Sequence, residues 1–418
     1  MQLIKNSSIY LGSSILNKSI PFLLLPILTE YLSPEEFGIL SIFQLLITFY
    51  SAFIGMAIHT NVSKNFYTYS KDKLATLIGN ILIILSVTTL IFLIPTLIGS
   101  FFSDSLFSVP SQWVNIIPFV SFMFMMNTIN LTILRNEEKS TLFGVFEVTN
   151  TIVNMGVSIL LLVVYKLGWE SRAYGIVLAY FVFFIISLIY MKRHHYLRLK
   201  YEPSEIKNIL NISLPLIPHA VGGIIISLSD RFFIEKMIGI DMVGIYSVGY
   251  MFGMIIFIFS DAFIKAWSPW FYKKLSNPTI IIKQKIVKYS YLYIIGLFVL
   301  AFLLTLISKL LIDLFIDEKF NGAEQFIFWI SIGYAIHGVY KIFFPYLVHI
   351  NKTSFLGYST MLTAIINLIL NYFMIDYYGA IGATYATALS FSVSTALVFW
   401  FQNKEFEMPW FYFLRSKD

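Results

Sequence analysis

The stretch ISLPLIPHAVGGIIISLSDRFFI, residues 212–234, decides how the rest of this chain is interpreted. It is long and apolar enough to cross a bilayer, for which about 20 residues suffice. Yet it contains two prolines, a histidine, a glycine pair and the charged residues Asp230 and Arg231. On a helix, His219, Gly223 and Ser227 share one face with either Asp230 or Arg231, because steps of three or four residues return to the same side. A span with such a polar stripe cannot contact lipid all round, so we expect it to line a protected cavity.

The composition agrees with a membrane protein. The chain has 418 residues, of which 58% are hydrophobic and 12% charged, with a mean hydropathy of +0.77. These values exclude an ordinary soluble domain and a disordered chain. The chain has no cysteine, so disulfides and thiol-bound metals are excluded. The net charge of +6 is interpreted as basic residues that set membrane orientation rather than as a sign of a nucleic-acid partner.

The hydropathy pattern predicts an all-α integral membrane protein with twelve transmembrane helices; their arrangement as two parallel-related six-helix bundles around a central lumen follows from the repeats and the resemblance given below. The first span is too long for a signal-peptide core, so we expect it to be retained. The predicted domains are an N-terminal bundle (1–191), a cytoplasmic connection (192–210), a C-terminal bundle (211–402) and a cytoplasmic tail (403–418). The predicted spans are 9–32, 37–58, 75–99, 112–134, 141–165, 172–191, 211–237, 242–266, 287–315, 324–349, 354–377 and 380–402.

Two parallel halves are indicated by weak internal similarity in a common order. FGILS at 37–41 matches VGIYS at 243–247, and TIVN at 151–154 matches AIIN at 364–367. Transporters built from such repeats bind their substrates between the halves, near the bilayer midplane. Lysine and arginine are concentrated in alternate loops, beginning with the N-terminus, which predicts that both termini are cytoplasmic.

Four basic residues are not accounted for by the loops and span ends, namely Lys18, Arg231, Lys265 and Lys341. Each would cost about 2.5–3.5 kcal/mol at a lipid-facing helix centre, so we expect them to be paired or hydrated. Asp261 precedes Lys265 by four residues, which favours an ion pair along one helix. Adjacent residues do not face each other on a helix, so we expect Arg231 to find its partner on another helix, in water or in a ligand.

Two further groups are candidates for the lumen. His337 and Lys341 lie four residues apart and share a helix face, which indicates a hydrated surface. Lys18 has serines on the same side of the first span. Glu147 and Asp261 are the acidic candidates for ion coupling, although Glu147 lies near a span end, where plain hydration explains it equally well.

Enzyme classes find little support in the sequence. It has no P-loop, no nucleotide-binding glycine pattern and no cluster of metal ligands, so no cofactor, metal or ATPase domain is predicted on this chain. A membrane glycosyltransferase or polysaccharide polymerase is the competing enzyme class. Such enzymes need acidic residues and usually a sizeable external loop, whereas the acidic segments SPEE (33–36) and DEKFNGAE (317–324) are short.

Several motifs together resemble a family. SLPLIP at 213–218, SDRFFI at 229–234, VGIYSVGY at 243–250 and NLILNYFMIDYYGAIGATYATALS at 367–390 are similar to bacterial polysaccharide-repeat-unit flippases of the Wzx type. These belong to the multidrug/oligosaccharidyl-lipid/polysaccharide exporter superfamily. The resemblance implies two six-helix bundles around a V-shaped lumen in the bacterial inner membrane. It implies carriage of a polyprenyl-diphosphate-linked oligosaccharide, such as an O-antigen repeat unit of lipopolysaccharide, from the cytoplasmic to the periplasmic leaflet.

The resemblance also suggests site residues and partners. Basic lumen residues would contact the diphosphate and sugars; Arg231 carries over from SDRFFI and Lys18 from a first-helix cation. Asp230, His337 and Lys341 join this predicted site by position. The implied partners are an undecaprenyl-diphosphate-linked glycan and membrane lipids, with a polysaccharide polymerase and a chain-length regulator as candidates. A multidrug/cation antiporter of the same superfamily is the alternative, and the cationic bias speaks against it.

Overall fold

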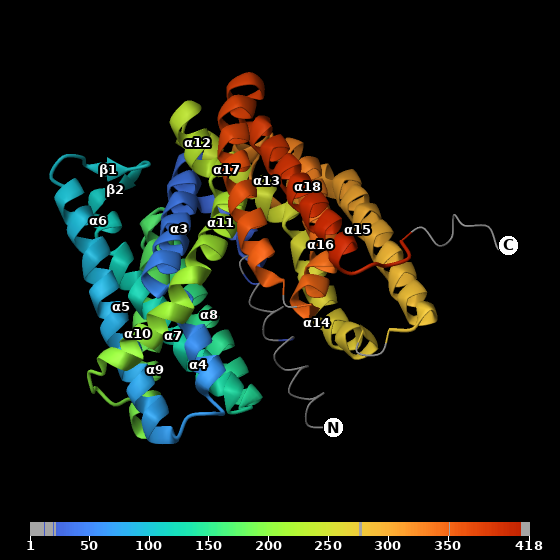
Figure 1. Ribbon diagram of the computed structural model, residues 1–418. Coiled ribbons are helices and arrows are strands. Elements are labelled where there is room, and N and C mark those ends of the chain that lie inside the picture. The colour runs from blue at the N-terminus through green and yellow to red at the C-terminus, as the bar shows by residue number, and fades with distance from the viewer. Residues whose placement is uncertain (1–11, 13–19, 21, 276–277, 351, 411–418) are drawn as a thin grey trace. The chain divides into compact units, whose positions relative to one another are not determined.

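The computed structural model describes residues 12, 20, 22–275, 278–350 and 352–410 (Figure 1). Apart from the hairpin of β1 (Ser105–Leu106) and β2 (Val109–Pro110), the regular structure in these ranges is helical. Eleven helical segments of the described chain are long and apolar enough to cross a membrane. The predicted all-α membrane class is therefore confirmed. Eleven of the 24 residues of the predicted first span, 9–32, lie outside the described residues, so the count of twelve stays a prediction.

The chain divides into two compact units, the first comprising Met1–Ile224 and Gly239–Gly244. In this unit α7 packs against α3 and α9, and α8 packs along α9. Its helices are α2 (Leu25–Tyr31), α3 (Pro34–Gly55), α4 (His59–Asn65), α5 (Lys71–Gly99), α6 (Ser111–Val114), α7 (Ile117–Asn136), α8 (Ser140–Val163), α9 (Glu170–Arg193), α10 (Pro203–Ser213) and the first part of α11 (Ile217–Leu228).

The second unit comprises Ile225–Ile238 and Ile245–Asp418. Helix α16 is its centre, because α14, α15 and α18 all pack against it. Figure 1 shows α18 in front of α16, with which it packs, and α15 beyond α18. The helices are the end of α11, α12 (Asp230–Met237), most of α13 (Ile240–Gly253), α14 (Ile255–Leu275), α15 (Ile280–Phe315), α16 (Glu324–His349), α17 (Thr353–Tyr378) and α18 (Ala380–Glu405), with a 3₁₀ turn at Glu318–Phe320.

The acidic SPEE segment turns out to be a helix start. Ser33 Oγ accepts the Glu36 N–H at 3.1 Å, and the Glu36 carboxylate accepts the Ser33 N–H at 3.0 Å. This capping box satisfies two amides that the first turn of α3 leaves without helical partners, and Pro34 needs no such partner. Glu36 also accepts the backbone N–H of Trp169 at 3.3 Å, which ties the start of α9 to α3. These two glutamate contacts are structural.

The connection at 192–210 packs onto unit 1 rather than acting as a free linker. Asn80, buried on α5, donates from Nδ2 to the Lys200 carbonyl at 2.9 Å and accepts the Glu202 N–H at 3.0 Å. The Arg198 N–H donates to the Ala75 carbonyl at 3.1 Å. By its contacts this segment belongs to unit 1, which continues to Ile224, whereas the sequence-based boundary was placed at residues 191 and 211.

The segment that decided the fold class is not one continuous helix. A 3₁₀ turn at Leu214–Leu216 precedes α11, α11 ends at Leu228, and α12 begins at Asp230. The first interruption coincides with Pro215, which has no N–H to donate to a helix. The second interruption places Asp230 and Arg231 in the first turn of a new helix. Its consequences for the charged pair are described below.

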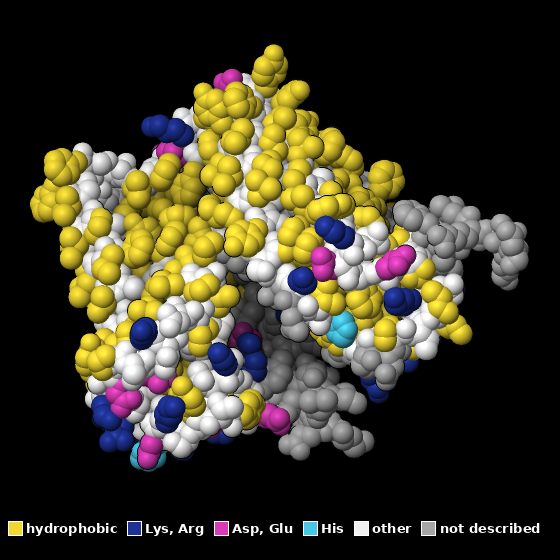
Figure 2. Space-filling view, in the orientation of Figure 1, with side chains coloured by type: hydrophobic (Ala, Val, Ile, Leu, Met, Phe, Trp, Pro, Cys, Tyr) yellow, Lys and Arg dark blue, Asp and Glu magenta, His cyan; other side chains and the backbone are white. Residues whose placement is uncertain are grey.

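The lipid-facing surface is recognisable from burial. Within their most apolar stretches, α5 and α15 bury only 22% of their residues inside the protein. Figure 2 shows hydrophobic side chains over much of the visible face, with lysines and arginines gathered toward its lower part. Apolar side chains that are exposed on transmembrane helices are the expected contact for lipid tails.

Candidate functional site

The first polar cluster of unit 2 is built around Asp230. Asp230 is 1% exposed, and its Oδ1 accepts the N–H of Arg231 at 2.8 Å and Nη1 of the same residue at 3.2 Å. The Tyr246 hydroxyl on α13 donates to Oδ2. The carboxylate is therefore surrounded by donors. Its position at the start of α12 places it beside backbone amides that have no partner within the helix.

The prediction that Arg231 cannot pair with its neighbour is wrong. The guanidinium of Arg231 and the carboxylate of Asp230 form an ion pair at 3.2 Å. The expectation assumed a continuous helix, in which adjacent side chains diverge. Because the helix restarts at Asp230, the carboxylate folds back over the first turn and meets both the backbone and the side chain of Arg231.

Arg231 is otherwise enclosed by α13. Its guanidinium carbon lies 4.2 Å from the ring centroid of Tyr250 and 5.6 Å from that of Tyr246, and Nε donates to Ser247 Oγ at 3.3 Å. Such cation–π contacts gain strength when water is excluded. With 7% of Arg231 exposed, these contacts define a packed structural core for the start of α12.

A chain of aromatic residues leads from this cluster to a second one. The Tyr250 hydroxyl donates to the Ser227 carbonyl at 2.8 Å and is also hydrogen-bonded to the hydroxyl of Tyr334 on α16. The ring of Tyr334 contacts Phe257 on α14, with centroids 5.5 Å apart, and lies 6.5 Å from His337. Polar and aromatic groups from α12, α13, α14 and α16 are thus continuous through unit 2.

The second cluster contains one carboxylate and two ammonium groups. Asp261 Oδ2 lies 3.1 Å from Lys265 Nζ along α14, which is the pair expected from their spacing. Asp261 Oδ1 lies 3.5 Å from Lys341 Nζ on α16. The Lys341 ammonium also sits 4.1 Å above the ring of Phe257. The cluster carries one more positive than negative charge, and its side chains are 15–43% exposed.

His337 lies on α16 one turn before Lys341, and both side chains approach the ring of Phe257, whose centroid is 6.1 Å from that of the imidazole. The imidazole of His337 stacks on Phe391, with centroids 4.6 Å apart, and on Tyr340 at 5.6 Å. Its Nδ1 is buried and has no hydrogen-bond partner among the described residues. An ammonium beside several aromatic faces can hold an anionic, partly apolar ligand, since the cation binds phosphate as a point charge and the rings supply contact area.

Two asparagines of α17, Asn367 and Asn371, form hydrogen bonds between helices. Asn367 Oδ1 accepts the hydroxyl of Ser229 at 3.1 Å and Nδ2 of Asn371 at 3.0 Å, while Asn367 Nδ2 donates to Ser390 at 3.1 Å. Interhelical hydrogen bonding of this kind is common among membrane helices. Because Ser229 directly precedes Asp230, the network also fixes the position at which α12 begins.

Unit 1 contains a buried cation at the first residue of the predicted span 172–191. Arg172 is the third residue of α9 and is 8% exposed. Its Nη1 donates to Asn154 Oδ1 and, at 3.2 Å, to Ser158 Oγ on α8. The four-residue spacing of Asn154 and Ser158 was the available signal, because two acceptors on one helix face call for a donor. Glu147 lies partly buried on the same helix.

The remaining predicted site residues are distributed as follows. Lys18 lies outside the described residues, and the side chain of His219 is likewise not described. Asp230, Arg231, Asp261, His337 and Lys341 all belong to unit 2, whereas Glu147 belongs to unit 1. The structure therefore gathers most of the predicted positions around the aromatic chain of unit 2.

Comparison with solved structures defines the class of protein. The fold is similar to that of an inward-facing MATE multidrug transporter of the MOP superfamily, with a TM-score of 0.76, 14% identity and coverage of 93% of this chain and 94% of that one. It is also similar to the lipid II flippase MurJ in an inward closed conformation, with a TM-score of 0.71, 15% identity and coverage of 95% and 87%. The chain thus has the fold of multi-pass membrane transporters.

The chain belongs to the Polysaccharide biosynthesis protein family, which it matches over residues 3–274. It is 24% identical to "Lsg locus putative protein 1" of Haemophilus influenzae over 372 residues, which cover 88% of this chain and 90% of the relative. It is 25% identical to the "Probable low-salt glycan biosynthesis flippase Agl15" of Haloferax volcanii over 195 residues, which cover 46% of this chain and 41% of the relative. The family resemblance drawn from the motifs is confirmed.

Proposed function

We propose that this protein flips a polyprenyl-diphosphate-linked oligosaccharide, such as an O-antigen repeat unit, from the cytoplasmic to the periplasmic leaflet of the inner membrane. Membership of the Polysaccharide biosynthesis protein family supports transport of a glycan. The observation that carries the proposal is the placement of the ammonium groups of Lys265 and Lys341 around Asp261, beside aromatic rings within a membrane-spanning unit. An anionic head group is the ligand that such a cluster favours.

The proposed mechanism is an exchange of partners. Without substrate, Asp261 neutralises part of the charge of Lys265 and Lys341, which lowers the cost of keeping ammonium groups at membrane depth. A diphosphate carries more negative charge than one carboxylate, so when it binds it replaces Asp261 as the ion-pair partner of the two lysines. The released Asp261 can then accept a proton or cation, which is how it would couple transport to an ion gradient. Glu147 on α8 is the second acidic candidate for this coupling.

We assign a supporting role to Asp230 and Arg231. Both are buried, and the guanidinium is occupied by Asp230, Ser247 and two tyrosine rings. Through Tyr250 and Tyr334 the pair supports the aromatic chain on which His337 lies. Lys18 remains a proposed contact of the diphosphate. Alternating access would expose the head group first to one side of the membrane and then to the other.

Deletion and complementation test the proposal. Loss of the protein should strand lipid-linked repeat units on the cytoplasmic face and abolish the surface polymer. Wild-type protein should restore the polymer, whereas a Lys265→Ala/Lys341→Ala variant of equal membrane abundance should not. Reconstituted protein should move the lipid-linked glycan between leaflets without altering its glycosidic bonds, which separates a transporter from a polymerase or glycosyltransferase.

The likeness to MATE structures makes a multidrug/cation antiporter the second candidate. That function predicts normal surface polymer in the deletion strain together with increased sensitivity to cationic drugs. Asp261 would then be the substrate-binding group, and Asp261→Asn would reproduce the drug sensitivity while the lysine variants would not.

A further inference from the structure

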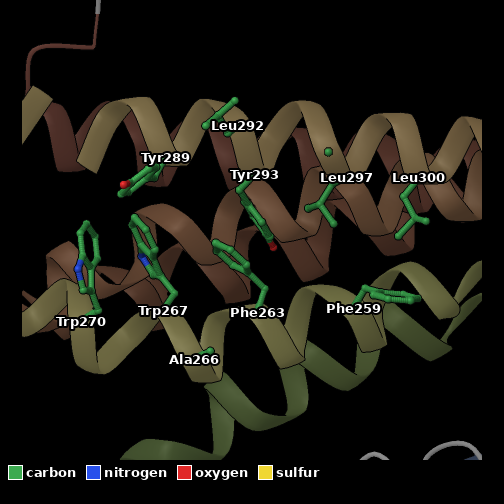
Figure 3. Close-up of a pocket in the computed structure, with 11 residues that line it drawn as sticks. Phe259, Phe263, Ala266, Trp267, Trp270, Tyr289, Leu292, Tyr293, Leu297 and Leu300 are labelled. Atoms are coloured by element: carbon green, nitrogen blue, oxygen red, sulfur yellow. The ribbon is translucent and has the colours of Figure 1, made fainter. Parts of the chain in front are cut away.

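A deep groove runs between α14 and α15 in unit 2. Its volume is about 640 Å³, and aromatic side chains dominate its lining. Phe263, Trp267 and Trp270 extend from α14, and Tyr289 and Tyr293 face them from α15 (Figure 3). The rings form a continuous layer, with centroids 4.1 Å apart for Phe263 and Tyr293, 4.7 Å for Trp267 and Trp270, and 5.6 Å for Trp270 and Tyr289.

The groove lies on a lipid-facing part of unit 2. Helix α15 is the less buried of its two walls, and Leu292 at the rim is 57% exposed. From Tyr289 to Leu300 the helix rises about 16 Å at 1.5 Å per residue, which is roughly half of a 30 Å hydrocarbon core. The groove therefore matches the depth of one leaflet. Gly296 opens its wall, since no atom lies within 4 Å of the position that a β-carbon would occupy there.

One end of the groove is basic. Lys285 Nζ lies 5.8 Å from the ring centroid of Tyr289, which lines the groove. Lys288 is exposed on the adjacent turn of α15, and Lys273 and Lys274 occupy the last turn of α14 beyond Trp270. The groove thus presents an apolar body about one leaflet long and a cationic mouth. This pattern is complementary to an amphiphile with a long hydrocarbon tail and an anionic head.

The other side of α14 carries the charged cluster of the candidate site. Ser260 accepts a hydrogen bond at 2.8 Å from the hydroxyl of Tyr293, which lines the groove, and the next residue is Asp261. A lipid whose tail occupied the groove would therefore have its head group retained beside the helix that bears Asp261 and Lys265. An apolar groove elsewhere on the surface would offer no such proximity.

We propose that this groove binds the polyprenyl tail of the transported lipid, with the diphosphate at the basic mouth when the substrate is captured; the inference rests on the function proposed above. The aromatic layer keeps the tail in an apolar environment while the head group passes to the lysines of the cluster. A phospholipid acyl chain has related chemistry, and the experiment has to separate the two.

Photocrosslinking of the full chain in lipid nanodiscs tests this proposal. The probe is a polyprenyl diphosphate with a diazirine in its first isoprene units, and a phospholipid with a diazirine in its acyl chain is the comparison. We expect the polyprenyl probe to label peptides of α14 and α15. Unlabelled polyprenyl diphosphate should compete, and excess phospholipid should not.

Gly296→Phe fills the groove and should weaken polyprenyl labelling roughly tenfold, the loss that corresponds to 1.4 kcal/mol. Gly156→Phe on α8 is the matched control, because Gly156 is also an exposed helical glycine with open space at its β-carbon position. Labelling of the Gly156→Phe variant should equal that of the wild type. Equal labelling of α14 and α15 by both probes, or labelling that Gly296→Phe leaves intact, would overturn the proposal.

Failure of the groove proposal and failure of the proposed function have different signatures. If Gly296→Phe loses polyprenyl labelling yet supports normal surface polymer, the groove is not the tail site used in transport, and the flippase function stands. If wild-type protein moves no lipid-linked glycan and its deletion leaves the polymer intact, the function itself fails.

Discussion

Lys341 Nζ on α16 lies 3.5 Å from Oδ1 of Asp261 on α14, and the other oxygen of the same carboxylate is 3.1 Å from Lys265 Nζ. The carboxylate of Asp261 thus pairs with one ammonium group on its own helix and with another on α16. Removing Asp261 would leave two ammonium groups close together, whereas removing one lysine would leave a simple ion pair. This asymmetry allows the structural and the substrate-binding roles of the cluster to be separated.

Asp261→Asn should lower the stability of the protein by about 1–3 kcal/mol, less than for a fully buried pair because the partners are partly exposed. Combining it with Lys341→Met should recover much of this loss, since the repulsion is removed. Thermal unfolding of detergent-solubilised protein measures both effects. A double variant no more stable than Asp261→Asn alone would contradict the coupling of these residues.

Lys341→Ala should reduce transport about tenfold or more at unchanged membrane abundance, as expected when a charge-assisted contact to phosphate is lost. The measurement is the amount of surface polymer in cells that produce the variant, compared with the amount of the variant protein in the membrane. Lys319→Ala is a suitable control, because Lys319 forms an exposed pair with Asp317 at 3.7 Å. Equal losses in the two variants would argue against a specific role for Lys341.

Arg231→Ala should lower membrane abundance, because it leaves the Asp230 carboxylate buried without its cation, at a cost of about 3–5 kcal/mol. Asp230→Asn/Arg231→Ala should be more abundant than Arg231→Ala alone. Arg231→Lys should also destabilise the protein, since an ammonium cannot reproduce the planar stacking between Tyr246 and Tyr250. If Arg231→Ala is normally abundant in the membrane but does not transport, Arg231 contacts the substrate rather than stabilising the fold.

Glu137, between α7 and α8, gives a prediction for pH. Burial opposes its ionisation, but hydrogen bonds from Tyr190 at 2.6 Å and Tyr196 at 2.8 Å, together with Lys139 at 3.1 Å, outweigh this effect and hold the pKa of Glu137 below its ordinary value. A depressed pKa stabilises the fold at pH values above the unfolded pKa of about 4.3. The stabilisation should therefore be constant from pH 8 to 5 and disappear as the pH falls through the lower, folded pKa.

The measurement is the midpoint of thermal unfolding against pH for wild type and Glu137→Gln. We expect the wild type to be the more stable of the two at neutral pH and the difference to narrow below about pH 4.3. A difference that stayed constant down to the lowest pH would show that the hydrogen bonds, rather than the charge, supply the stability.

The helices themselves were largely predictable. The predicted span 324–349 coincides with α16, and 75–99 differs from α5 only at its first residues. Every segment that spans the bilayer must be apolar over about 20 consecutive residues, and this property is read from the local sequence alone. The boundaries of such helices can therefore be predicted from the sequence. The division of the segment 211–237 at Ser229 was not predictable in this way, because it involves Asn367 and Asn371, which lie more than a hundred residues away.

The pairing of charges was less predictable for the same reason. The ion pair of Asp261 and Lys265 is predicted by their four-residue spacing on one helix. The contact of Lys341 with Asp261 depends on how α16 packs against α14, which the sequence does not show. Arg172 is the first residue of the predicted span 172–191, because charged residues mark the ends of hydropathy windows. Its burial becomes visible only when α9 lies against Asn154 and Ser158 of α8.

The internal repeat has a packing role that its sequence did not reveal. Gly38 and Gly244 occupy equivalent positions in FGILS and VGIYS. A β-carbon on Gly38 would overlap the carbonyl of Ile240, and one on Gly244 would overlap the carbonyl of Pro34. Gly38→Ala and Gly244→Ala should therefore each destabilise the protein by about 1–3 kcal/mol, as overpacking does. Gly156→Ala, which meets open space, should not, and unfolding midpoints of the three variants provide the comparison.

Topology can be tested without background labelling because the chain contains no cysteine. Ser105 lies exposed in the β1–β2 hairpin, and the side chain of Lys200 is 58% exposed. If the basic loops are cytoplasmic, an impermeant thiol reagent should label Ser105→Cys in cells with a permeable outer membrane, and Lys200→Cys only after the inner membrane is opened. Labelling of both variants after opening shows that each cysteine is accessible. The reverse pattern would place the basic connection outside and would invert the direction in which a lipid-linked glycan is expected to enter.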